Sequence, residues 1–471
     1  MKPSPHLPAS QIRARFAAAM SQMYRQEVPL YGALVNMVED INQRVLQQQP
    51  ALKQAMLDSG ALARLNDERH GAIRLGSAAE LATMRRLFAV MGMYPVGYYD
   101  LSVAGIPVHS TAFRPLDIDE LNRNPFRIFT SLLRLDLIAD EGLRHKAQAI
   151  LQQRNIFSAS LIDMIEAFEQ QQGLNEEQAE QFIREALETF RWHHQATVDI
   201  ETYQQLLKAH RLIADIVCFR GPHINHLTPR TLDIDAAQQQ MREQQMQPKA
   251  IIEGPPKRQH PILLRQTSFK ALDEEIEFVQ HNKESTSGFH TARFGEIEQR
   301  GMALTPKGRA LYDRLLNEVR QEQPDAANHS AEYVAQLEQT FRRFPDDLQQ
   351  IRRDKLGYFR YLAGSKPLKI RPQDKLNDLI ERSEITLSPI TYEDFLPVSA
   401  AGIFQSNLKQ DDASDFERSP NQQQFEQDLG CKVIDEFAWY QKIQRESLLQ
   451  TLQQAAVDEA RQQQLLAQIS A

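Results

Sequence analysis

Two histidines and one glutamate, far apart in the chain, have the side chains needed to hold a metal ion. His70 and His226 each lie on the first expected strand of a similar run of elements, and Glu296 lies on the last strand of the second run. Two imidazoles and one carboxylate form the facial set that binds non-haem Fe(II) and leaves coordination positions open for substrate and O₂. A single histidine is more often structural, but the shared placement of these residues on strands favours a metal site.

Two neighbouring residues offer alternative ligands. His223 precedes His226 by three positions, so on a strand its side chain faces the other way. Glu298 follows Glu296 by two positions and therefore shares its face. The residues alone leave both pairs open.

Arg74 is the candidate for binding a substrate. It follows His70 by four positions, and in a regular strand the two side chains point the same way. A guanidinium in a metal cleft can bind a carboxylate through two parallel hydrogen bonds. The alternative is a structural ion pair with Glu298 or Asp67.

The elements that must position these residues occur twice in the same order. Residues 69–133 are predicted to form a strand, a helix that a Ser77-Ala-Ala-Glu80 capping box opens, and three further strands. Residues 218–320 repeat this order, with a helix capped by Asp233, strands expected at 250–253 and 261–269, and a final strand over 292–300. We therefore expect an α+β fold with a core of two βαβββ-type units.

Apolar residues at helical spacing predict helices around and between the two units. The expected helical segments are an N-terminal segment at 1–68, an insertion at 134–217, and C-terminal helices at 421–471. Residues 321–420 combine helices, a basic stretch at 342–375, and closing strands.

The composition argues against several classes of function. Lys and Arg total 54 against 62 Asp and Glu, a net charge of −8, so we expect no nucleic-acid partner. The sequence has no run of about 18 apolar residues, so we expect no membrane span. Its two cysteines, Cys218 and Cys431, are too few and too far apart for a Cys-based zinc site. The first ten residues lack the apolar run of a secretory signal, so we expect a cytoplasmic protein.

Several stretches resemble known metal-dependent dioxygenases. Residues 294–300, FGEIEQR, resemble the FLEIIQR strand of hydroxyphenylpyruvate dioxygenases, and 226–234 resemble their H-x4-T-x-D-I strand. ERHGAIRLG, HINHLTPRTLDID and RFGEIEQRGMALTPKGR are more closely similar to the 2-oxoadipate dioxygenase/decarboxylase family. The resemblance covers about residues 10–405 and places the chain in the vicinal oxygen chelate superfamily. It implies a mixed sheet or half-barrel core with large helical insertions.

The resemblance also implies roles for particular residues. The metal ligands would be His70, His226 and Glu296, which favours these over His223 and Glu298. Glu298 departs from the resemblance, because the dioxygenase motif has an apolar residue there. Its expected roles are an ion pair with Arg300 or Arg74, or holding a ligand in place from outside the coordination sphere. The substrate would contact Arg74, which would bind its carboxylate, together with Val398 and Ser399.

The implied reaction is an oxidation of a 2-oxo dicarboxylic acid by O₂. The metal would be Fe²⁺, although another divalent metal can occupy such a site in a purified sample. The 2-oxo acid would chelate the metal and undergo oxidative decarboxylation and intramolecular hydroxylation, turning 2-oxoadipate into 2-hydroxyglutarate and CO₂, a step of lysine catabolism. The alternatives are a metal-dependent lyase or isomerase, or a dioxygenase of another 2-oxo acid, on the same scaffold. The sequence leaves the oligomeric state open.

Overall fold

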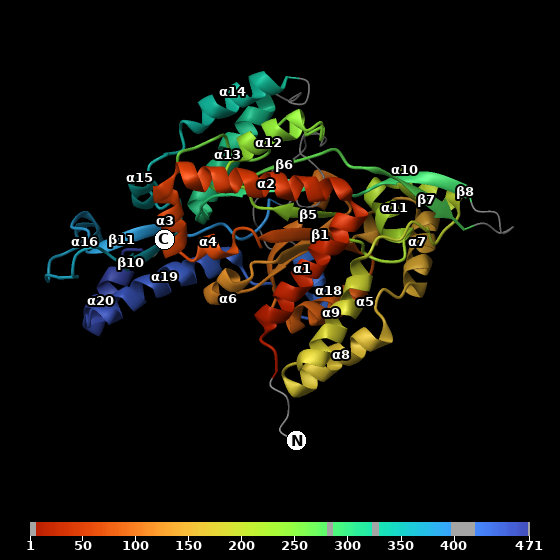
Figure 1. Ribbon diagram of the computed structural model, residues 1–471, viewed down its shortest axis with the longest axis horizontal. Coiled ribbons are helices and arrows are strands. Elements are labelled where there is room, and N and C mark those ends of the chain that lie inside the picture. The colour runs from red at the N-terminus through yellow and green to blue at the C-terminus, as the bar shows by residue number, and fades with distance from the viewer. Residues whose placement is uncertain (1–5, 280–285, 323–328, 397–419, 470–471) are drawn as a thin grey trace. The chain divides into compact units, whose positions relative to one another are not determined.

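The computed structural model describes residues 6–279, 286–322, 329–396 and 420–469 (Figure 1). The chain divides into two compact units. Unit 1 comprises Met1–Ile252, Gln266–Glu298 and Phe395–Val433, and unit 2 comprises Glu253–Arg265, Gln299–Asp394 and Ile434–Ala471. All the expected metal ligands belong to unit 1.

In the described part of unit 1, a five-stranded mixed sheet has the order β2-β3-β4-β1-β5. Its strands are β1 (Arg69–Leu75), β2 (Tyr94–Asp100), β3 (Val108–Arg114), β4 (Arg127–Leu133) and β5 (His226–Pro229). Strand β1 pairs in parallel with β4 and antiparallel with β5, so that Ala72 lies opposite His226. This register places the two predicted histidine ligands on neighbouring strands.

Strand β1 is buried along its whole length because both of its faces are covered. Ile73 packs in one hydrophobic core, and Ala72 packs in another on the opposite face. His70 and Arg74 alternate with Ile73 and therefore share the face of Ala72. The sheet thus points both polar side chains into one interior region.

The helices of unit 1 include the predicted insertion and the predicted N-terminal segment. Ser77 Oγ accepts a hydrogen bond from the Glu80 N–H at 3.3 Å at the start of helix α5, which is one half of the predicted capping box. The other half differs, because the Glu80 carboxylate accepts from the Gly76 N–H at 2.7 Å. The helices are α1 (Ala9–Glu27), α2 (Pro29–Gln48), α3 (Pro50–Asp58), α4 (Ala61–Arg64), α5 (Ala78–Val90), α6 (Ile118–Arg123), α7 (Glu141–Gln153), α8 (Ala159–Gln171), α9 (Glu176–Phe190), α10 (Ile200–Ala209), α11 (Arg211–Val217), α12 (Ile234–Glu243) and α18 (Pro420–Leu429), with short 3-10 turns η1 (Ser102–Ala104) and η2 (Leu135–Leu137).

The second run of elements differs in detail from the expected order. After β5 and α12 come β6 (Leu264–Ser268), β7 (Asp273–Phe278), β8 (Thr286–Thr291) and β9 (Glu296–Arg300). The expected strand at 250–253 does not form, and a hairpin of β7 and β8 was not expected. Four of the six residues of β7 are acidic, and its side chains are mostly exposed or half-buried, so its sequence resembles a solvated loop.

Strand β9 begins at Glu296, later than expected, and pairs with β6. The preceding Gly295 lies against the ring of Phe269, and a Cβ atom there would come within 2.2 Å of that ring. The chain can therefore approach this packed aromatic only through glycine. Glu296 follows at once, at the start of the strand.

Unit 2 contains a two-stranded hairpin and a set of helices. Its elements are α13 (Pro306–Glu322), α14 (Ser330–Phe341), α15 (Leu348–Arg353), β10 (Phe359–Ala363), α16 (Leu376–Glu381), β11 (Ile385–Pro389), α19 (Glu436–Gln454) and α20 (Glu459–Leu466). Helix α19 packs beside β10 (Figure 1). Its Gln444 and Ser447 side chains accept hydrogen bonds from the Phe359 and Tyr361 N–H groups at 2.9 and 3.0 Å. These bonds satisfy donors that an edge strand would otherwise leave unpaired.

Across the described ranges, the structure has no helix that is both long and apolar enough to cross a bilayer.

Candidate metal and substrate site

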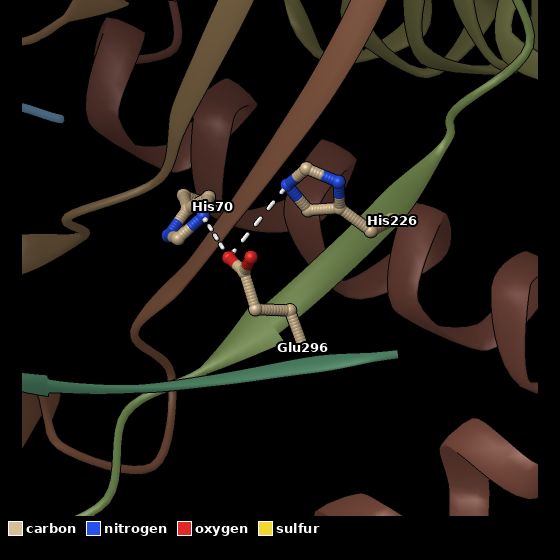
Figure 2. A group of neighbouring side chains, drawn as sticks. All are labelled: His70, His226 and Glu296. Carbon is tan, nitrogen blue, oxygen red and sulfur yellow. Dashed lines mark hydrogen bonds and ion pairs between the residues drawn. The ribbon is translucent and has the colours of Figure 1, made fainter. Parts of the chain in front are cut away.

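His70, His226 and Glu296 converge at one buried point in unit 1 (Figure 2). They come from β1, from the first residue of β5, and from the first residue of β9. His70 Nε2 lies 3.2 Å and His226 Nε2 lies 3.9 Å from Glu296 Oε1. One ligand atom from each residue lies within 4.8 Å of the other two, and all three side chains are fully buried.

The unused atoms of this group fit a metal ion. Both ring nitrogens of His226 and Oε2 of Glu296 are buried without a hydrogen-bond partner in the described structure. Buried polar atoms without a partner are costly and rare in folded proteins. Imidazole nitrogens and a carboxylate oxygen are ligands that suit a divalent transition metal. The group therefore has the donor atoms of a metal site, and some of these atoms have no hydrogen-bond partner in the described structure.

Glu298 holds the ring of His70 from the side opposite Glu296. Its Oε2 lies 3.2 Å from His70 Nδ1, and Arg127 Nη2 donates to its Oε1 at 3.1 Å. The ring of Phe395 packs edge-on against His70, with centroids 4.8 Å apart. A carboxylate at Nδ1 keeps the proton on that nitrogen and leaves Nε2 for a metal.

Two neutral side chains orient Glu296. Its Oε1 accepts hydrogen bonds from Thr228 Oγ1 and from Gln266 Nε2, both at 3.0 Å. These bonds, together with the His70 contact, fix Oε1 and leave Oε2 as the unpartnered oxygen.

The electrostatic environment differs between the two histidines. Burial alone would lower the pKa of His70, but the charges of Glu298 and Glu296 outweigh burial and raise it. Burial raises the pKa of Glu296, despite its hydrogen bond with His70. Burial and the nearby charges of His70 and Arg74 hold the pKa of His226 well below its usual value. His226 is therefore neutral and ready to bind a metal.

We expect metal affinity to rise with pH, because His70 and Glu296 must lose protons to bind a cation. The raised pKa of each group keeps its proton to higher pH, so protons compete with the metal on the acid side. Anaerobic competition for Zn²⁺ with a chromophoric chelator, between about pH 6 and pH 8, measures this. An apparent affinity that does not change over this range would contradict the expectation.

Arg74 is anchored by a buried carboxylate on helix α11. Its Nη1 donates to Asp215 Oδ2 at 2.6 Å. The other oxygen, Oδ1, lies 2.9 Å from His290 Nε2 and 3.2 Å from His223 Nε2. Burial alone would raise the pKa of Asp215, but the charges of His223 and Arg74 hold it well below its usual value. Asp215 is thus an anion that positions Arg74.

A cavity of about 260 Å³ lies beside Arg74 and Asp215 and is also lined by Phe294. Its other charged lining residues are Arg211, Lys249 and Lys270. Phe294 packs against the ring of His226, with centroids 4.8 Å apart, so the cavity adjoins the histidine ligand. Arginine and lysine residues outnumber the one aspartate in this lining, so the cavity attracts anions.

The structure places the alternative candidates at different points of unit 1. His223 lies at Asp215, away from the group that could hold a metal, and Glu298 lies behind His70. Arg74 forms a buried ion pair with Asp215, a partner that was not among the expected ones. Val398 and Ser399 lie outside the described residues, so their proposed contacts stay predictions.

Sequence reasoning missed Asp215, Arg127 and Gln266. A signal existed for the first of these, because Asp215 is the only charged residue in the apolar stretch LIADIVCF at 212–219. A lone carboxylate in a buried helix needs a partner. Gln266 and Arg127 lie in sequences that are typical of strands, so nothing in the sequence marks either residue as part of the site.

Comparison with known proteins gives consistent matches over nearly the whole chain. The family model described as 2-oxoadipate dioxygenase/decarboxylase matches residues 16–407. Proteins of that name from Escherichia coli and Pseudomonas putida are each 56% identical over 443 residues, which is 93% of this chain and 97% and 95% of theirs. A crystal structure of the hydroxyglutarate synthase from Pseudomonas putida in complex with 2-oxoadipate is 53% identical, with a TM-score of 0.89, over 96% of this chain and 99% of that one.

Proposed function

The chain belongs to the 2-oxoadipate dioxygenase/decarboxylase family, and from that membership we propose that it converts 2-oxoadipate and O₂ into 2-hydroxyglutarate and CO₂. One oxygen atom enters the new carboxylate left after CO₂ departs, and the other becomes the hydroxyl on the neighbouring carbon. The substrate is thus both the reductant and the molecule that is hydroxylated, so no second organic acid is needed.

The observation that supports this proposal best is the buried group of His70, His226 and Glu296 with its unpartnered atoms. We assign Fe²⁺ to this group, since two histidines and one carboxylate are the ligand set of non-haem iron oxygenases. When bound, the iron would supply the redox chemistry with O₂ that oxidative decarboxylation requires.

The remaining residues bind and orient the substrate. Arg74 would bind a carboxylate of 2-oxoadipate through its guanidinium, since Asp215 engages Nη1 and holds the side chain in place. Val398 and Ser399 are proposed as further substrate contacts. Phe395 and Phe294 pack on the rings of His70 and His226 and help exclude water from the site.

The test is O₂ consumption by the purified, Fe²⁺-reconstituted protein with 2-oxoadipate, with 2-oxoglutarate and hydroxyphenylpyruvate measured alongside. We expect uptake with 2-oxoadipate, matched by CO₂ and 2-hydroxyglutarate. Uptake only with another 2-oxo acid would keep the reaction class and change the substrate. No uptake with any of them, in protein shown to contain iron, would overturn the proposed activity.

Asp215→Asn tests the proposed positioning of Arg74. The amide keeps the shape of the carboxylate but removes the charge, so Arg74 loses a charge-assisted hydrogen bond. We expect KM for 2-oxoadipate to rise about tenfold, the lower end of the range for a charged hydrogen bond, with kcat much less affected. Steady-state O₂ uptake measures both constants. A KM that falls would instead show that Asp215 competes with the substrate for Arg74.

A further inference from the structure

A second cavity, of about 470 Å³, is formed wholly by residues of unit 2. Three cationic residues from the end of helix α15 and the turn after it line this cavity, namely Arg352, Arg353 and Lys355. They belong to the basic stretch at 342–375, to which the proposed reaction gives no role. The metal-binding group does not line the cavity, so this would be a separate site.

The charge at this cavity is arranged for an anion. Arg352 Nε is buried and makes no hydrogen bond in the described part of the chain. Helices α13 and α19, of 17 and 19 residues, begin at the cavity wall, at Pro306 and at Asp435, the N-cap of α19. Helix N-termini carry partial positive charge and favour anions. Asp435 is acidic, but its Oδ1 already accepts a hydrogen bond from the Ala438 N–H at 2.8 Å.

Gln444 adds a neutral donor whose orientation is fixed. Its side-chain oxygen accepts the Phe359 N–H at 2.9 Å, so the amide cannot be reversed without leaving that N–H unpaired. The residue is 7% exposed and lines the cavity. Its amide NH₂ forms no hydrogen bond with another described residue. A donor that a nearly buried side chain holds in one orientation at a cavity wall is suited to bind an acceptor on a ligand.

Three aromatic residues line another part of the wall. Tyr358, Tyr361 and Phe437 line the cavity, and both tyrosines are almost fully buried. Burial raises the pKa of Tyr361 to about 12, against the effect of the nearby Arg352 guanidinium, so its hydroxyl stays protonated and able to donate. A volume of 470 Å³ falls in the range of cavities that hold organic ligands. An inorganic anion alone would leave this aromatic wall uncovered.

We propose that this cavity binds a phosphorylated small molecule with a planar ring, a ligand of the mononucleotide class. Its phosphate would lie at Arg352, Lys355 and the N-terminus of α13, because guanidinium and ammonium groups bind phosphate strongly. Its ring would lie against the aromatic wall, with a ring acceptor at the NH₂ of Gln444. This proposal does not depend on the reaction proposed for unit 1.

Isothermal titration of the full-length, metal-loaded protein with adenosine monophosphate tests the proposal, with adenosine, inorganic phosphate and 2-hydroxyglutarate as parallel probes. We expect saturable binding of adenosine monophosphate at or below about 1 mM and much weaker binding of the other three. No binding of adenosine monophosphate would overturn the proposal. Equal binding of inorganic phosphate would overturn the ring contact, and preferential binding of 2-hydroxyglutarate would overturn the phosphate assignment.

Two variants locate the binding. Gln444→Glu keeps an oxygen for the Phe359 N–H but replaces the NH₂ donor with a second, charged oxygen, so we expect adenosine monophosphate to bind at least tenfold more weakly. Arg352→Gln should give a similar loss. Arg342→Gln is the matched control, because Arg342 is an exposed arginine of the same basic stretch that does not line the cavity. The nucleotide binds elsewhere if Gln444→Glu and Arg352→Gln both keep the affinity and the melting temperature of the unaltered protein.

Discussion

Glu296→Ala is expected to eliminate turnover of 2-oxoadipate, whereas Glu298→Ala should reduce it about 10–100-fold, the range for residues that support a metal ligand. Glu296 supplies a carboxylate whose Oε2 is unpartnered and which lies 3.2 and 3.9 Å from the two histidines. Glu298 contacts His70 through Nδ1, the nitrogen on the far side of the ring from Glu296. Loss of Glu298 therefore loosens one ligand, while loss of Glu296 removes a ligand.

The measurement pairs O₂ uptake with iron content per protein, so that lost metal is separated from lost chemistry. A melting curve for each variant is the control for folding, because both carboxylates are fully buried. Gln266→Ala is a milder comparison, since it removes one hydrogen bond to Glu296 and keeps every proposed ligand. Full activity in Glu296→Ala together with lost activity in Glu298→Ala would show that the other carboxylate binds the metal.

The placement of the candidate metal ligands could be predicted in part, because side chains alternate strictly between the two faces of a strand. Once His70 and Arg74 were placed on one strand, their shared face followed from the pleat. That rule does not apply to His223, because β5 begins only at His226 and His223 lies in the irregular segment before it, where it contacts Asp215. The pairing of β1 with β5 could not be predicted from alternation along one strand, because the register between strands depends on contacts between distant segments.

The support around the site was harder to predict. Arg127 and Gln266 act through partners 171 and 30 positions away in the chain, Glu298 and Glu296. No local pattern encodes such pairs, since polar residues on strands usually face solvent. The β7–β8 hairpin was not predicted for a related reason. Acidic residues have a low strand propensity, so whether such a segment forms a strand depends on its pairing with a neighbouring strand.

Arg74→Ala is expected to lower kcat/KM for 2-oxoadipate by about 100-fold, the upper end of the range for a charged hydrogen-bonding partner. The loss should be large because, without the guanidinium, the anion of Asp215, which lines the same cavity, would repel the carboxylate of the substrate. Arg74→Lys should recover part of the rate, since an ammonium keeps the charge but not the two parallel hydrogen bonds. Wild-type kcat/KM in Arg74→Ala would remove Arg74 from substrate binding.

The substrate itself provides the control that separates recognition from structural damage. A 2-oxo acid of the same length without the distal carboxylate, 2-oxohexanoate, cannot use a guanidinium at that end. If Arg74 binds the distal carboxylate, the unaltered protein and Arg74→Ala should turn over 2-oxohexanoate at similar kcat/KM, and the deficit should be confined to 2-oxoadipate. The effects on kcat/KM of removing the Arg74 side chain and of removing the distal carboxylate would then be non-additive. Non-additivity is expected when a protein group and a substrate group contact each other. An equal loss on both substrates would mean that Arg74 stabilises the fold around Asp215 or binds the carboxylate next to the 2-oxo group.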